Sequence, residues 1–280
     1  MNIKSITTKT ITAFNSFADQ KIKSLIIIVL FSFISCQINE NSDFEKLQKE
    51  TKENLLFLDK YVVSEKPDFN IDSFGILTAE KLVKLMTFTD SRKLNLKEYG
   101  NLEISAFTHD SFDIHIYNFY YYTGGSMGSR DYSVIQWKNK NNKLFAYHLT
   151  EALEWEYIEI YKLNSNSDNL FLLVGSTQVT ANQYIGLAKV IQINDSNINL
   201  DYPSFVNKSE FEIWSNNLTF DTLTETLSFG LFEEESDQNL KMYDSVTYRK
   251  IFKVFEKNME QDDDGCWLVK LKFNGNKFIE

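Results

Sequence analysis

Residues Phe112–Tyr122 have the sequence FDIHIYNFYYY, and the fold class follows from this segment and its neighbours. Its β-branched and aromatic residues suit a pleated, half-buried surface, so we predict a strand there. From Leu102 onward the hydrophobic pattern changes from a period of about 3.6 to a period of about 2. The same pattern predicts further strands at Val134–Trp137, Leu144–His148, Tyr157–Leu163, Leu170–Gly175, Tyr184–Ile193 and Trp267–Phe273.

Short polar clusters separate these strands, at residues 139–142, 164–169 and 194–197. They are rich in Asn, Asp and Ser, which favour turns, and such short connections join antiparallel neighbours. We therefore predict a mainly β fold, an antiparallel meander that forms a sandwich or an open barrel. A small propeller-like arrangement is the alternative, and one or two α-helices are expected to precede the strands.

The residues before the strands show helical spacing. Phe44, Leu47, Leu55 and Leu58 recur among Lys and Glu, which predicts an amphipathic helix from about residue 43 to residue 63. A second helix is predicted at residues 78–86. We therefore expect a helical segment over residues 43–100 and an antiparallel β domain over residues 101–280.

A secretory signal is indicated near the start of the chain. Basic residues between Lys21 and Lys23 precede an apolar run, Leu25–Ile34, and the small residue Ser35 precedes Cys36. The pattern is typical of a bacterial lipoprotein and predicts a signal peptide over residues 1–35, a lipid on Cys36 and a tether over residues 36–42. Phe33 stands where the usual pattern has Leu, so an ordinary signal peptide cut elsewhere and an uncleaved anchor are the alternatives.

The charge of the chain excludes one class of partner. The formal net charge is −10, and removal of residues 1–36, with their four Lys and one Asp, takes it to −13. Nucleic-acid binding requires clustered Lys and Arg, so we expect no nucleic-acid partner. With Cys36 assigned to the lipid, Cys266 has no intramolecular partner, and we expect a fold without disulfides.

Three sequence motifs of the β region resemble those of a known protein family. They are the aromatic strand Ile116–Phe119, the turn Gly124-Gly125-Ser126-Met127 and the strand Val134-Ile135-Gln136-Trp137. Together with the ending at residues 271–278, they resemble a family of uncharacterised Bacteroidetes lipoproteins. Family members often have Asp-Gly before the first strand, where this chain has Asp110-Ser111. The resemblance implies a lipoprotein and implies no particular activity.

Residues 124–128 spell G-x-S-x-G, the string of a hydrolase nucleophile elbow. That elbow needs a helix directly after the Ser, whereas residues 131–137 predict a strand. We interpret the string as a glycine-rich connection between strands. An envelope hydrolase that uses Ser126 is the alternative function.

His109, Asp113 and His115 lie at even spacing, which on one strand would place three metal-ligating side chains on one face. A turn through Asp110-Ser111 interrupts that strand, and no fourth ligand is evident. Residues 260–265 match half of a calcium loop, but the position of its final Glu is Leu271. We therefore predict no metal and no cofactor.

The aromatic residues offer a candidate binding surface. On a strand, Tyr120 and Tyr122 share one face, and rings with polar tips suit contacts with sugars or proteins. The candidate surface comprises Tyr120, Tyr122, Gly124, Gly125 and Trp137. We expect an exported, lipid-anchored protein of the cell envelope, in the outer membrane. Its expected role is a non-enzymatic binding or accessory module whose partner is an envelope protein or glycan.

Overall fold

The computed structural model divides the chain into two compact units, Met1–Lys49 and Glu50–Glu280. It describes residues 42–61, 69–109, 112–123, 128–149, 156–165, 169–180, 183–205, 210–213, 218–231, 260–261 and 267–279. In the first unit the described residues, 42–49, are helical, and this helix runs on to residue 59. No helix of the described residues is both long and apolar enough to cross a membrane, and the apolar run at residues 25–34 lies outside them.

The second helix is α2, Ile71–Met86, and it begins earlier than the predicted residue 78. Asn70 caps it, since its side chain accepts a hydrogen bond of 3.0 Å from the backbone N–H of Ser73. Two short 3₁₀ helices follow, η1 at Thr89–Lys93 and η2 at Leu96–Glu98.

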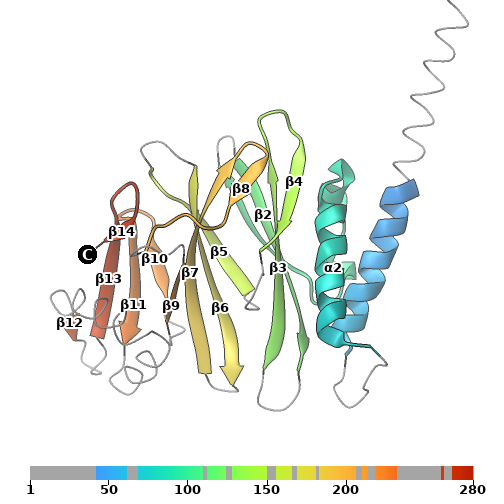
Figure 1. Cartoon of the computed structure of the whole chain (residues 1–280), viewed down its shortest axis with the longest axis horizontal. Coiled ribbons are helices and arrows are strands. Elements are labelled where there is room, and N and C mark those ends of the chain that lie inside the picture. The colour runs from blue at the N-terminus through green and yellow to red at the C-terminus, as the bar shows by residue number, and fades with distance from the viewer. Residues whose placement is uncertain are drawn as a thin grey trace, which may run out of the picture. The chain divides into compact units, whose positions relative to one another are not determined.

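The strands form three sheets that follow one another along the chain (Figure 1). The first sheet has the order β1-β2-β3-β4 and is antiparallel throughout. Its strands are Glu103–His109, Phe112–Tyr122, Ser129–Lys138 and Leu144–His148.

The second sheet has the order β5-β6-β7-β8, and β9 also pairs with β7. Its strands are Glu156–Lys162, Leu170–Thr180, Gln183–Asn194, Asn197–Asn199 and Glu210–Ile213. The third sheet has the order β10-β11-β13-β12, and β14 pairs with β13. Its strands are Thr219–Asp221, Thr226–Leu231, Glu260–Gln261, Trp267–Phe273 and Phe278–Ile279.

Two hydrophobic cores join the sheets face to face. The first core packs Ile116 and Ile135 of the first sheet with Phe171 and Leu187 of the second. The second core packs the opposite face of the second sheet, including Leu172 and Val190, against Phe229 and other residues of the third. The second sheet is therefore covered on both faces, which explains the unbroken apolar run at residues 170–174.

The other face of the first sheet is covered by α2, which contacts β3 and β4. Gly75 of α2 lies against the ring of Tyr132, and the buried Tyr132 ring stacks on Phe119 with centroids 5.1 Å apart. The prediction of a mainly β, antiparallel meander preceded by helices is confirmed. The described strands do not close into a barrel. The first sheet is a simple meander, whereas in the third sheet β13 lies between β11 and β12. The three sheets pack face to face in succession, as blades of a propeller do, but α2 occupies the outer face of the first.

Candidate functional site

Tyr120 and Tyr122 lie together near the end of β2. Their ring centroids are 5.2 Å apart in an edge-to-face arrangement, and their hydroxyls are 3.5 Å apart. Tyr122 is 57% exposed. The hydrogen bond between the Tyr120 and Tyr122 hydroxyls is the main cause that raises the pKa of Tyr120 to about 12. The Tyr120 hydroxyl is thus uncharged at physiological pH.

Trp137 lies at the opposite end of the same hairpin. It pairs with Ile114 near the start of β2, whereas Tyr122 pairs with Ser129 at the other end. Its side chain is only 4% exposed, and the indole Nε1 donates a 2.8 Å hydrogen bond to the backbone carbonyl of Asp195. The structure therefore separates Trp137 from the tyrosine pair and places it in contact with the second sheet.

Several sequence predictions fall outside the described residues. They are the lipid site Cys36 with its signal peptide, Gly124, Gly125 and Ser126 of the glycine-rich connection, Cys266, and the acidic residues 262–264.

A pocket of about 310 Å³ opens beside Trp137. Its lining comes from the start of β2, the end of β3, the end of β5 and the end of β7. In antiparallel sheets these termini lie at one end, so the pocket sits between matching ends of the first and second sheets. Ile114, Trp137 and Ile193, each at most 4% exposed, supply its apolar lining. Four of the ten lining residues are apolar and six are polar or charged, so the pocket is a concave site of mixed character.

Lysines supply most of the charge in this lining: Lys138, Lys140 and Lys162. Lys138 Nζ lies 3.4 Å from Asp113 Oδ2, and Lys162 Nζ lies over the Phe112 ring, 4.3 Å from its centroid. Asp195 is the carboxylate in the lining. The sequence reasoning had not singled out these lysines; the signal was the cluster Lys138-Asn139-Lys140 directly after Trp137.

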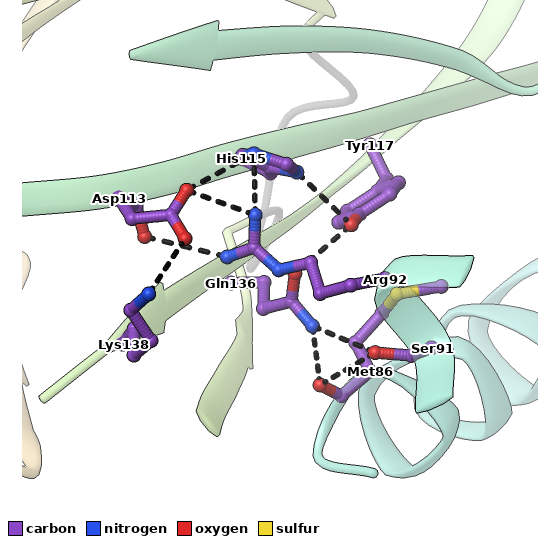
Figure 2. Close-up of polar contacts among 8 residues, drawn as sticks. All are labelled: Met86, Ser91, Arg92, Asp113, His115, Tyr117, Gln136 and Lys138. Carbon is purple, nitrogen blue, oxygen red and sulfur yellow. Dashed lines mark hydrogen bonds and ion pairs between the residues drawn. The ribbon is translucent and has the colours of Figure 1, made fainter. Parts of the chain in front are cut away.

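A polar network lies on the helix-facing side of β2 and β3 and includes Lys138 (Figure 2). Arg92 of η1 donates from Nη1 to Asp113 Oδ1 at 3.0 Å and from Nη2 to the Asp113 backbone carbonyl at 3.3 Å. The same Nη1 contacts His115 Nε2. Because a guanidinium only donates, Nε2 accepts, which places the proton of a neutral imidazole on Nδ1. Tyr117 Oη lies 3.4 Å from that nitrogen.

Gln136 continues the network from the sheet to the helical segment. It is fully buried, and its Oε1 accepts a 2.9 Å hydrogen bond from the Tyr117 hydroxyl. Its Nε2 donates to the Met86 carbonyl at the end of α2 at 2.5 Å and to Ser91 Oγ at 3.0 Å. Both donor and acceptor atoms of a buried amide are thereby satisfied, as burial requires.

The charges of the network shift two pKa values. Burial alone raises the pKa of Asp113, but Arg92, His115 and Lys138 together outweigh burial and hold the pKa of this carboxyl below its usual value. Burial, and then the positive charge of Arg92, lowers the pKa of His115 despite the opposing effect of Asp113. The stable state is therefore an ionised carboxylate, a guanidinium and a neutral imidazole.

This arrangement is a cation-filled site rather than a metal site. Arg92 contacts both Asp113 and His115, so its guanidinium occupies the place that a metal would take between them. His109 ends β1, whereas Asp113 and His115 lie on β2, so the three residues do not share one strand. Within the described part of the chain, no group of three His, Cys, Asp or Glu residues is arranged to hold a metal ion.

Acidic pH is expected to weaken the fold through His115. Its pKa is lower in the folded protein than the value of about 6.5 in an unfolded chain, so the unfolded state binds more protons in that interval. The stabilising contribution is fully present above about pH 6.5 and is lost as the pH falls through the folded pKa. Urea unfolding of the full-length chain at pH 7.5 and pH 5.5 measures the loss.

His115→Gln keeps an acceptor for Arg92 but cannot titrate. The drop in unfolding free energy between the two pH values should therefore be smaller in this variant than in the wild type. An equal drop in both proteins would contradict the assignment to His115 and point to the other histidines.

Comparison with known proteins adds no assignment, since no protein-family model, no curated protein and no solved structure matches this chain.

Proposed function

We propose that this protein is an exported, lipid-anchored protein of the cell envelope. It acts as a non-enzymatic binding module and takes its ligand in the pocket beside Trp137. The observation that carries the binding role is that pocket, about 310 Å³ in volume and formed by matching ends of two packed sheets. Three of its lining residues, Ile114, Trp137 and Ile193, are held by the core between those sheets, which supports a preformed site. The anchor rests on the stretch Lys21–Cys36.

The location of the pocket supports a ligand role over a structural one. Ile114, Trp137 and Ile193 of its lining belong to the core, and the lining also contains lysine and asparagine residues, including Asn139 and Asn169. Such a lining combines an apolar surface with polar groups that fix the orientation of a ligand. An envelope glycan or a small molecule released from the envelope fits this description.

Intact-mass and native mass spectrometry of the full-length protein, extracted from its host in nonionic detergent, tests the proposal. We expect the wild type to retain a small molecule and Asn169→Trp, which fills the pocket, to lose it. Asn164→Trp is the matched control, because Asn164 lies on the same connection between β5 and β6 but outside the pocket lining. Equal retention in all three proteins, or retention in none, would contradict the pocket assignment.

The same spectra test the anchor. A mature chain that starts at Cys36 should be heavier than its polypeptide by the mass of the attached acyl groups. Labelling with an alkyne fatty acid should mark the wild type and not Cys36→Ala. Label on both proteins or on neither would contradict the lipid anchor and leave the result for the pocket unchanged.

A further inference from the structure

The pocket carries a charge opposite to that of the protein. The whole chain has a formal net charge of −10, yet the pocket lining contains Lys138, Lys140 and Lys162 against the single carboxylate of Asp195. Lys138 directs its ammonium to Asp113 on the helix-facing side of the first sheet, so Lys140 and Lys162 supply the positive charge of the pocket. Two ammonium groups against one carboxylate leave a local positive potential in an acidic protein.

Two of these lysines are available to a ligand. Lys138 is not one of them, because its Nζ forms an ion pair with Asp113 Oδ2 at 3.4 Å. Among the described residues, no carboxylate oxygen lies within 4.0 Å of the Nζ of Lys140 or Lys162. Lys162 instead lies over the ring of Phe112, which leaves its ammonium hydrogens without a charged acceptor in this part of the chain. Even with Lys138 neutralised by Asp113, the lining keeps an excess of positive charge.

The apolar lining residues determine what the uncharged part of the ligand must be. Ile114, Trp137 and Ile193 belong to the core between the first and second sheets, and they present carbon surface to the pocket. The indole N–H of Trp137 is already used by the Asp195 carbonyl, so Trp137 offers the ligand its apolar atoms. A ligand must therefore have a compact apolar body and a negative group directed at the lysines.

We infer that the pocket selects small organic carboxylates, with the carboxylate held by Lys140 and Lys162 and the apolar body against Ile114, Trp137 and Ile193. The inference rests on the proposed binding function and names the chemical class of its ligand.

A pair of probes that differ only in charge tests it: 4-fluorophenylacetate and its neutral isostere 4-fluorophenylacetamide. Their affinities for the full-length protein in nonionic detergent are measured by ¹⁹F NMR, with detergent alone as the blank. The wild type should bind the carboxylate at least about tenfold more tightly than the amide, a difference of about 1.4 kcal/mol. In Lys140→Gln/Lys162→Gln the ratio should fall to about one to three, with the affinity for the amide unchanged.

Lys97→Gln is the control, because Lys97 is an exposed lysine of η2 outside the pocket lining, and it should retain the wild-type ratio. Equal binding of both probes to the wild type, abolished by Asn169→Trp, would overturn the charge selection while the pocket function stands. Binding of neither probe would also overturn the inference, and the mass measurements above decide the proposed function separately.

Discussion

Gln136→Leu is expected to lower the free energy of unfolding by about 3–4 kcal/mol, because each buried polar group left without a partner costs about 1–3 kcal/mol. Leu has nearly the same volume, so the effect measures lost hydrogen bonds rather than a cavity. The Met86 carbonyl loses its 2.5 Å donor and keeps only the 3.4 Å hydrogen bond from Ser91 Oγ. Ser91 Oγ loses the donor at 3.0 Å, and the Tyr117 hydroxyl loses its 2.9 Å acceptor. Urea unfolding of the full-length chain at pH 7.5 provides the measurement.

Tyr117→Phe supplies the partner for a double-mutant cycle. Alone it should cost about 1 kcal/mol, since it leaves Gln136 Oε1 without its donor. In the Gln136→Leu background the same change should cost less, because the bond is already absent. Additive costs, or a Gln136→Leu variant within about 0.5 kcal/mol of the wild type, would show that this amide does not hold the helical segment to the sheet.

Gly175→Ala is expected to destabilise the protein by about 3 kcal/mol, at the upper end of the range for overpacking. Gly175 lies in β6 opposite Tyr157, next to the register shift between Tyr157 and Glu159. A Cβ on Gly175 would lie closer than 3.0 Å to the carbonyl oxygen of Glu156 and 3.2 Å from the Cα of Tyr157. These are backbone atoms of the paired strand, so β5 must move to accommodate the methyl group.

Ser176→Ala, one residue along the same strand, is the matched control and should change stability by less than about 0.5 kcal/mol. Melting curves of the two variants compare the costs directly. If Gly175→Ala were as stable as the control, β5 would have to approach β6 less closely than the structure shows.

The strands of this chain were largely predictable, because in a half-buried strand apolar and polar residues alternate with a period of 2. The bounds of β2, Phe112–Tyr122, and of β4, Leu144–His148, coincide with the predicted ones. The start of α2 was missed by seven residues, since its cap, Asn70, lies before a stretch in which the exposed Ile76 and Leu77 blur the apolar stripe.

The candidate site was less predictable, because its members are distant in sequence. Gln136 was noted only as part of the motif Val134–Trp137, and nothing in the sequence identified Met86 and Ser91 as its partners. The same holds for Arg92, which lies 21 residues from Asp113 in the chain. Trp137 was a candidate as part of a surface with Tyr122, whereas hairpin pairing places the two at opposite ends.

The class of fold, the antiparallel pairing of neighbouring strands and the expectation of a lipid anchor could all be inferred from the sequence. These follow from local periodicity, turn residues and a linear signal. The packing of three successive sheets face to face, and the position of Lys140 and Lys162 in the lining of one pocket with Trp137, became evident only in the folded chain. The reason is physical: periodicity shows which face of a strand is buried, but the partner of that face depends on packing between segments far apart in the chain.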